Sequence, residues 1–508
     1  MCNAKIKSIE EMSQIITQGK ANGVHFVHCH GVFDLVHPGH INHFESAKKH
    51  GDKLIVSITP DCFVNKGPGR PAFKQDARLK QLACLNCVDY VVLNDQPDAV
   101  SLIKTLRAQS YAKGVEYSQH HKDVTGKIAQ EVGAVESVGG QIVYTDGEVF
   151  SSSELINQFI DKDAQRMAPF VAKLRSYADL ASIQETVNKF QDLTIMLVGD
   201  AILDSYQYVT PLGQSGKGQH ICATLEQGEL FLGGSLIVAN HLASFVKEVI
   251  LVTCVGEHCP HLSWIKQKLA PNVRPHFICH AQLDTLIKKR YIFKDGEYLH
   301  KIFETYSHNQ DLLDHHQTQD LVKFIEQQGS EVDAIFVSDF GNGFTNPMLT
   351  QALSSTPTFL ALNTQTNSGN RGFNVVTHYS RADFISLNEP EVRLAAHDRT
   401  SPLATVCHDL SQLMSCSLLA ATRGTKGALI IAGQDQWEIP IFTDYAIDRV
   451  GAGDSFFALA SLAASVKAHP LIVGLLGSAA AAIKVHSIGN KQAVERTSFL
   501  KYIIRLVK

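Results

Sequence analysis

The fold of the first third is decided by HFVHC at residues 25–29 and by GVFDLVHPGHINHFESAKKHG at residues 31–51. The first stretch predicts a buried strand, and the second predicts a turn that leads into a helix. Two further apolar runs, KLIVSIT at 53–59 and DYVVLN at 89–94, are each followed by a helical segment. Strands that alternate with helices predict a parallel sheet of the α/β class.

A second and larger α/β sheet is predicted to begin at TIMLVGDAILD, residues 194–204. Further apolar runs, most of them separated by helical stretches, occur at residues 248–256, 334–341, 359–365, 383–389, 418–424 and 428–433. We therefore predict two doubly wound parallel-sheet domains of the α/β class. Their expected bounds are residues 1–160 and 191–508, with a charged helical connector at 161–190.

Two segments of the second domain have the short strands and turns of a small accessory sheet. They lie at residues 208–234 and 285–306. Asp295-Gly296 in the second segment is a strong hairpin signal. We expect these strands to lie apart from the central sheet.

The composition indicates a globular cytoplasmic protein. The 508 residues are 44% apolar and 19% charged, values that exclude a disordered chain. The net charge of −4 gives no electrostatic basis for binding nucleic acid or an anionic membrane. We expect no membrane span and no signal peptide, because residues 1–20 are polar and no long apolar run follows. Eleven scattered cysteines, among them the isolated pair Cys84 and Cys87, indicate reduced thiols.

Two histidines mark the start of the first long helix. Pro38 suits a first helical turn, where its missing N–H would have no partner in any case. His37 and His40 would then share one helical face at the end of the strand, where backbone N–H groups and the helix dipole favour anions. Imidazoles beside a polyphosphate suit nucleotidyl transfer, which depends on positioning and on charge neutralisation. The alternative is that both histidines only cap or pack. His28 and His30 on the strand are expected to pack rather than to bind a metal ion, because no third ligand is in view.

This segment resembles the HxGH signature of the nucleotidyltransferase superfamily, and more closely the GxFDxxHxGH pattern of its cytidylyltransferase-like branch. The resemblance covers about residues 20 to 160 and implies a Rossmann-like domain with catalytic His37, His40 and Lys66. It also implies nucleotide contacts from Gly31, Phe33, Asp34, Gly39, Arg78, Lys113, Gly114, Ser151, Ser152 and Ser153. One position departs from the pattern, since His30 stands where sugar-nucleotide members often have asparagine.

The strongest motif of the second half is DRVGAGD at residues 448–454, which leads into a helical stretch. Small residues at Gly451, Ala452 and Gly453 let backbone N–H groups point into open space at a helix N-terminus, which makes an anion hole for a transferring γ-phosphate. Asp454 lies at the same place and could accept the proton of a substrate hydroxyl. A lone GxGD is often only a glycine turn with an N-cap, and companion motifs argue against that alternative.

The motif resembles the C-terminal signature of the PfkB, or ribokinase-like, carbohydrate kinases, over roughly residues 190 to 508. ATP contacts are implied for Thr422, Arg423, Gly424 and Gly427. Asn388 and Glu391 would organise Mg²⁺ through water. Sugar contacts are implied for Asp200, Asp204, Gly233 and Gly234, and Arg290 of the accessory sheet is a further candidate sugar contact. The accessory sheet would be the family's lid, and we expect a homodimer through it.

The sugar-binding region also departs from the family pattern. Ile237 stands where many heptose-kinase-like members have an asparagine, and Asn240 lies further along. The sugar contact is therefore expected to be altered. Asn363, Gln365 and the pair Asn370-Arg371 lie near predicted strand ends, where they suit substrate contacts or solvated loops equally well.

Together the two sites predict a bifunctional transferase of nucleotide-sugar synthesis. One site would use ATP and Mg²⁺ to phosphorylate a sugar hydroxyl, and the other would join ATP or CTP to a sugar phosphate with release of pyrophosphate. The pair resembles the bifunctional heptose kinase/adenylyltransferase family with the domain order reversed, so a heptose-like sugar is the first choice.

Two alternatives stay open. The transferase could act on a polyol phosphate such as glycerol 3-phosphate, beside a kinase-like domain of other or no activity. The chain could instead be a non-catalytic nucleotide- or sugar-sensing protein, which Asp454 and the two histidines argue against. The expected partners are small sugars or sugar phosphates and nucleoside triphosphates.

Overall fold

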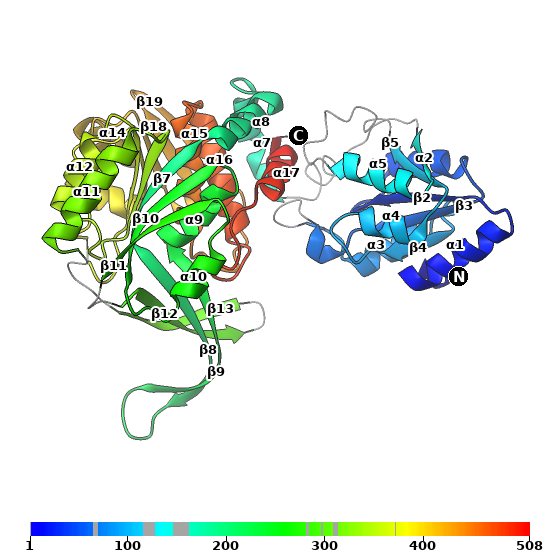
Figure 1. The fold of residues 1–508 in the computed structure, drawn as a ribbon, viewed down its shortest axis with the longest axis horizontal. Helices are drawn as coiled ribbons and strands as arrows, with labels where there is room; N and C mark the ends of the chain where they lie inside the picture. Colours follow the sequence, from blue (N-terminus) through cyan, green and yellow to red (C-terminus); the bar gives the residue numbers. More distant parts are fainter. Residues whose placement is uncertain are drawn as a thin grey trace. The chain divides into compact units, whose positions relative to one another are not determined.

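The computed structural model describes residues 2–64, 70–114, 127–145, 162–280, 284–295, 298–307, 313–370 and 372–507. The chain divides into two compact units, Met1–Gln165 with Leu500–Lys508, and Arg166–Phe499 (Figure 1). Each unit is built on its own α/β sheet, which confirms the predicted fold class. Among the described helices, none has the length and apolar character needed to cross a membrane.

The first unit contains a six-stranded sheet in which every neighbouring pair is parallel, in the order β1-β4-β3-β2-β5-β6. Its strands are β1 (Ile6–Lys7), β2 (Phe26–Gly31), β3 (Lys53–Ile58), β4 (Tyr90–Leu93), β5 (Ser110–Gly114) and β6 (Gln141–Thr145). From β2 the chain first builds the sheet outward through β3 and β4, and then returns to β5 on the other side. Such a reversal opens a crevice at the carboxyl ends of the two central strands, where α/β proteins bind ligands.

Helices cover both faces of this sheet. They are α1 (Ile9–Ala21), α2 (Pro38–Lys48), α3 (Gln75–Ala83), α4 (Val100–Leu106) and α5 (Lys127–Ser137). Alternate residues of β2 pack on opposite sides: Phe26 joins the core formed with α1 and α4, whereas Val27 and Cys29 join the core formed with α2 and α3. A strand covered on both faces is buried on both sides, and Phe26, Val27, His28 and Cys29 of β2 are all buried.

The second unit contains a nine-stranded sheet in the order β11-β10-β7-β14-β15-β16-β17-β18-β19. Its strands are β7 (Thr194–Gly199), β10 (Glu248–Gly256), β11 (Val273–His280), β14 (Ala334–Asp339), β15 (Phe359–Thr364), β16 (Phe384–Asn388), β17 (Leu418–Thr422), β18 (Ala428–Ala432) and β19 (Asp435–Ile439). The sequence predicts a wholly parallel sheet, but β17–β18 and β18–β19 pair antiparallel. Only two residues link β18 to β19, and a link this short can join only antiparallel strands.

The helices of the second unit lie in layers on its sheet. They are α8 (Leu180–Lys189), α9 (Ser235–Ala243), α10 (Leu262–Lys268), α11 (His315–Gly329), α12 (Pro347–Ser355), α13 (Glu389–Ala395), α14 (Leu403–Leu413), α15 (Ala452–Ser465) and α16 (Pro470–Lys484). Two further helices, α7 (Lys162–Arg175) and α17 (Arg496–Val507), contain the residues at which the chain passes from one unit to the other. Helices α11, α12 and α14 share one core with the central strands. Helix α15 packs on α16 and α9. Helices α7 and α8 occupy the segment predicted as a helical connector.

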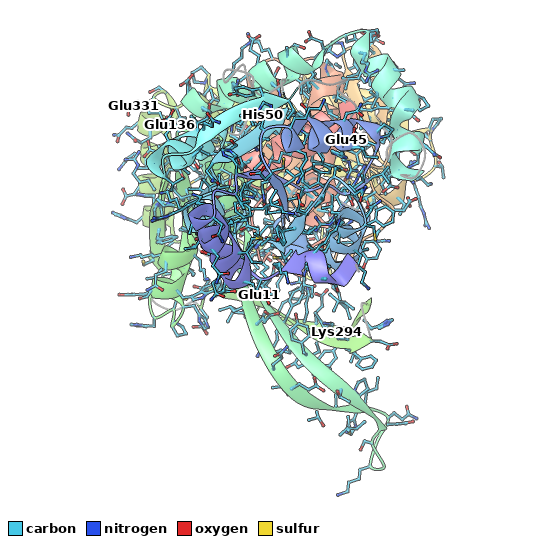
Figure 2. All side chains as sticks on the ribbon, turned by 90° about the vertical axis from the view of Figure 1, so that its right-hand side faces the viewer. Glu11, Glu45, His50, Glu136, Lys294 and Glu331 are labelled. Carbon is cyan, nitrogen blue, oxygen red and sulfur yellow. The ribbon has the colours of Figure 1, made fainter. Side chains whose placement is uncertain are left out.

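A separate four-stranded sheet, ordered β13-β12-β8-β9, confirms the predicted accessory sheet. Its strands are β8 (Ala201–Gln214), β9 (Ile221–Gly234), β12 (Leu286–Asp295) and β13 (Tyr298–Tyr306). Only one residue, Asp200, separates the end of β7 from the start of β8. Asp204 therefore lies on the accessory sheet, although the sequence predicted it at the strand that opens the central sheet. The distal β8–β9 hairpin stands clear of the other strands, whereas the end of β12 at Lys294 is still paired with β13 (Figure 2). Three apolar side chains of the hairpin, Leu212, Ile221 and Leu225, are exposed.

Candidate functional site

The most complete candidate site is a cavity of about 300 Å³ in the second unit. It lies outside the carboxyl ends of the parallel strands β15, β16 and β17, the usual place for a ligand in an α/β sheet. The lid supplies one wall through β8 and β12, and the turn that opens α15 supplies another. The cavity therefore brings the DRVGAGD motif and the lid residues to one place.

The turn before α15 is held open by two glycines. Gly451 is the N-cap residue of α15 with φ +82°, and a Cβ atom there would lie 2.3 Å from Asn490 Oδ1. At Gly453 a Cβ atom would meet nothing within 4 Å. The turn is anchored by Asp448, whose carboxylate accepts hydrogen bonds from Tyr206 Oη (2.5 Å) and from the backbone N–H of Gly489 (3.0 Å). The first N–H groups of α15 thus face the cavity on a fixed turn, as an anion hole requires.

We expect Gly451→Ala to lower the stability of the second unit and Gly453→Ala to leave it nearly unchanged. The left-handed backbone at Gly451 costs an L-residue about 1–2 kcal/mol, and the contact with Asn490 adds to this cost. Urea unfolding followed by tryptophan fluorescence isolates this effect, because both tryptophans of the chain, Trp264 and Trp437, belong to the second unit. Equal unfolding midpoints for the two variants would contradict the prediction.

Asp454 lies in the first turn of α15 and lines the cavity. Its Oδ1 accepts a hydrogen bond of 2.8 Å from Gln365 Nε2. Burial, and next the charge of Asp204, raise the pKa of Asp454 to about 6. A carboxylate with a raised pKa is a better proton acceptor and is still ionised at neutral pH, as a general base needs to be.

Asn388 and Glu391 form a capping box at the start of α13, and both line the cavity. Glu391 Oε2 accepts from the Asn388 N–H at 2.9 Å, and Glu391 Oε1 accepts from the Thr366 N–H at 3.1 Å. Burial raises the pKa of Glu391 to about 7. The described residues contain no cluster of three acidic, histidine or cysteine side chains that could hold a metal ion. The carboxylate and amide oxygens of Glu391 and Asn388 are groups of the kind that bind Mg²⁺ or its water ligands beside nucleotide phosphates.

The lid end of the cavity is strongly charged. Arg290 donates to Asp204 Oδ1 at 2.5 Å and forms an ion pair of 3.1 Å with Glu304. Gly233 leaves room for this arrangement, because a Cβ atom there would lie 2.6 Å from Asp204 Oδ2. Lys288, which the sequence reading missed, is buried and also lines the cavity. It pairs in register with Asp204 across β8 and β12.

Some predicted sugar and nucleotide contacts lie elsewhere. Asp200 does not line the cavity: its Oδ2 accepts from the Phe340 N–H at 2.8 Å, and burial raises its pKa to about 7. Ile237 is buried in α9, and the Asn240 side chain bonds the backbone at Lys268. Arg423 turns away to form an ion pair of 3.6 Å with Glu438. These side chains stabilise loops and helix ends instead of facing a ligand.

A second, mainly apolar cavity of about 280 Å³ adjoins the first. The two share Thr422, Arg449 and Gly453. Its remaining walls include Gly424, Gly427, Pro440, Ile441, Phe442, Phe456, Ala482 and Val485. An apolar cleft beside an anion hole suits a nucleoside whose phosphates reach into the first cavity.

The candidate site of the first unit lies at the start of α2, directly after β2. His37 is the N-cap residue of α2, and its ring stacks on that of His40 with centroids 3.9 Å apart. Phe33 contacts the edge of His40 at 5.2 Å and takes the unusual φ of +48°. Gly31 makes room for the Phe33 ring, because a Cβ atom there would lie 2.9 Å from it. Burial lowers the pKa of His37, so its imidazole is neutral at pH 7 and can donate one N–H to a phosphate.

Asp34 and Arg78, both predicted to contact the nucleotide, are engaged within the protein. Asp34 accepts hydrogen bonds of 2.9 Å from the backbone N–H groups of residues 72 and 73. Arg78 is 0% exposed and donates to the carbonyl oxygens of residues 32, 59 and 73 and to Asp61 Oδ1. Arg78 therefore fixes the loops that follow β2 and β3, which corrects its expected role as a phosphate contact.

Lys113 and Gly114 end β5, beside β2 in the sheet. Lys113 forms an ion pair of 2.7 Å with Glu131 and lies over the Tyr111 ring. Gly39 lies in the first turn of α2. Lys66, Ser151, Ser152 and Ser153, like Arg371, lie outside the described residues.

His28 and His30 form a polar chain on β2. Both bond Ser57 Oγ, at 2.7 Å and 2.8 Å, and His30 also bonds Thr59 Oγ1 at 3.2 Å. Burial lowers the pKa of His28 to about 3. These contacts fit the packing role expected for the pair.

Family comparisons treat the two halves of the chain separately. Residues 194–496 match the pfkB family carbohydrate kinase model, and residues 28–158 match the cytidylyltransferase-like model. A solved structure of phosphofructokinase-2 from Escherichia coli, in complex with substrates and products, covers 62% of this chain and 100% of that chain. It is 14% identical with a TM-score of 0.50, which shows a shared fold.

Curated relatives match the N-terminal part. The bifunctional protein HldE of Geobacter sulfurreducens is 34% identical over 163 residues, which are 31% of this chain and 31% of that protein. The bifunctional protein HldE of Gluconobacter oxydans is 36% identical over 142 residues, which are 27% of this chain and 28% of that protein. The chain thus matches less than a third of the length of these relatives.

Proposed function

The chain belongs to the pfkB family of carbohydrate kinases, and on this premise we propose that it is a bifunctional enzyme of nucleotide-sugar synthesis. Its C-terminal unit transfers the γ-phosphoryl group of ATP to a hydroxyl of a heptose-like sugar. Its N-terminal, cytidylyltransferase-like unit transfers a nucleotidyl group from ATP or CTP to a sugar phosphate. The observation that carries this proposal is the single cavity shared by Asp454, the Gly451–Gly453 turn and the charged lid residues.

In the proposed kinase step the nucleoside occupies the apolar cavity and its γ-phosphate lies at the Gly451–Gly453 turn. Asp454 accepts the proton of the sugar hydroxyl, the sugar oxygen bonds to the γ-phosphorus, and the bond to the bridging oxygen breaks to release ADP. Gln365 holds the Asp454 carboxylate in place. Mg²⁺ supplies charge neutralisation between the phosphates, and Asn388 and Glu391 would hold its water ligands.

In the proposed transferase step an oxygen of the sugar phosphate attacks the α-phosphorus, and pyrophosphate leaves. His37 and His40 bind the phosphates at the N-terminus of α2, where the helix dipole favours negative charge. Lys66 and the serines at 151–153, which lie outside the described residues, are proposed to bind the triphosphate as the family resemblance implies. The stacked rings of His37 and His40 support a joint role at this site.

The two reactions form a sequence, because the kinase product is a phosphate monoester and the transferase consumes one. The acceptor is proposed to be heptose-like. The expected homodimer through the lid stays part of the proposal, supported by the exposed apolar side chains of the β8–β9 hairpin.

The direct test offers the purified full chain a panel of heptoses, other sugars, their phosphates and glycerol 3-phosphate, with ATP or CTP and Mg²⁺. ADP formation and pyrophosphate release are measured separately. We expect ADP with a sugar acceptor, and pyrophosphate with a sugar phosphate and one of the two nucleotides. If glycerol 3-phosphate is the only acceptor that gives pyrophosphate release, the polyol alternative is favoured. If no acceptor gives either product, the proposed function is wrong.

A further inference from the structure

Lys484 is a buried cation that the proposed mechanism does not yet use. It is the last residue of α16 and is 1% exposed. Its Nζ donates to the carbonyl oxygen of Gly489 at 2.5 Å and lies 3.4 Å from Ser487 Oγ. Among the described residues, no carboxylate oxygen lies within 4.0 Å of it. Burying an ammonium group without a paired carboxylate is costly, so its presence calls for an explanation.

The place of Lys484 supplies that explanation. A Cβ atom at Gly451 would lie 3.1 Å from Lys484 Cε, so the lysine stem lies directly behind the anion hole. The loop that Lys484 holds, residues 487–490, bonds the motif in turn: the Gly489 N–H donates to Asp448 Oδ2 at 3.0 Å. Asn490 Nδ2 of the same loop donates to Asp204 Oδ2 at 3.1 Å.

The charges around Lys484 belong to the candidate site. Burial lowers the pKa of Lys484, and the carboxylates of Asp448, Asp454 and Asp204 oppose this shift because each favours the charged form of the lysine. Two of these carboxylates have ion-pair partners of their own, Asp204 with Arg290 and Asp448 with Lys301. Among the described residues, Asp454 has no ion-pair partner within 4.0 Å. Lys484 therefore adds a positive charge near a carboxylate that would otherwise repel the phosphates of a nucleotide.

We propose that Lys484 is a positioning residue of the kinase, a built-in cation that holds the 487–490 loop against the Gly451 turn and makes the anion hole electropositive. The proposal rests on the proposed kinase function. Lys484 is buried and does not line either of the two adjoining cavities, so it acts through the turn. A fixed positive charge behind the anion hole stabilises the transition state, in which negative charge develops on the transferring phosphoryl group.

The test uses a probe that needs no knowledge of the sugar. ADP with aluminium fluoride mimics the transferring phosphoryl group, whereas ADP alone does not fill the anion hole. Calorimetry on the full chain with Mg²⁺ compares the two ligands. In Lys484→Met we expect affinity for ADP with aluminium fluoride to fall at least about tenfold, and affinity for ADP alone to change less than about threefold. Lys491→Met is the matched control. Lys491 directly follows the 487–490 loop, but its side chain is 63% exposed.

A rescue experiment separates a charge effect from a folding defect. In Lys484→Ala, added ammonium or methylammonium chloride is expected to restore the preference for ADP with aluminium fluoride, since the small cation can occupy the space left by Nζ. Lys484→Arg, which keeps the charge, is expected to retain the preference without added salt. Tryptophan fluorescence during urea unfolding shows whether each variant is folded.

The outcomes distinguish this inference from the proposed function. If the wild-type chain does not prefer ADP with aluminium fluoride, the kinase proposal fails and this inference fails with it. If the wild type shows the preference and folded Lys484→Met keeps it, the inference alone is wrong. Equal losses for both ligands, or loss in Lys484→Arg as large as in Lys484→Met, would assign Lys484 a purely structural role and overturn the inference.

Discussion

Asp454→Asn is expected to abolish ADP formation while pyrophosphate release continues at the wild-type rate. Asparagine keeps the size of the side chain and an oxygen that can accept the 2.8 Å bond from Gln365, but it cannot take the proton of the sugar hydroxyl. Loss of a general base costs about 10²–10⁴-fold in rate. The measurement is steady-state ADP formation with the acceptor identified by the substrate panel, and pyrophosphate is followed in parallel.

The pH dependence gives the same prediction a second readout. The pKa of Asp454 is raised to about 6, and the base must be ionised to act. ADP formation by the wild type should therefore fall as the pH drops through about 6, with the activity retained above that value. The low residual rate of Asp454→Asn should not show this acid limb.

A matched control removes the same charge from the surface of the same unit. Asp409 is exposed on α14, and Asp409→Asn should behave as the wild type in rate and in pH profile. The mechanism fails if Asp454→Asn retains ADP formation within tenfold of the wild type, or if both variants lose the activity equally.

The central strands of both sheets were predictable because they are buried on both faces. β3 and β7 are nearly continuous apolar runs. The missed strands lack that signal. β5 lies inside its sheet, but its sequence SYAKG contains no continuous apolar run. β1 has only two residues, and β6 at the edge of its sheet is partly exposed. β11 is also an edge strand and contains a proline and two histidines. Edge strands are covered less, so their composition is not constrained to be apolar.

The candidate site was predictable where a motif is continuous in sequence, as in residues 448–454. It was not predictable where topology alone brings residues together. Lys288 stands in the basic run Lys288-Lys289-Arg290 of β12 and looks like a surface lysine, yet the parallel pairing of β12 with β8 brings it opposite Asp204. The predicted phosphate contact of Arg78 is wrong for the opposite reason. Carbonyl oxygens of two loops accept hydrogen bonds from its guanidinium group, and the sequence does not show these contacts.

His40→Ala is expected to abolish pyrophosphate release and to leave ADP formation unchanged. His40 lies in the first turn of α2, and its ring contacts both His37 and Phe33. Removing it takes away one phosphate donor and the ring that holds His37 in place. Losing a preorganised donor of this kind costs about 10²–10³-fold in rate. The two products are measured separately with the sugar phosphate and nucleotide found by the substrate panel.

The control for His40→Ala is His50→Ala, since His50 lies exposed beyond the end of α2 (Figure 2). It should leave both activities intact. Far-UV circular dichroism during heating compares the folding of both variants, because the first unit contains no tryptophan to report on it. If the two reactions occur at separate sites, each variant loses only one activity. Asp454→Asn stops ADP formation alone, and His40→Ala stops pyrophosphate release alone. If either folded variant loses both, a single site performs both reactions and the two-site mechanism is wrong.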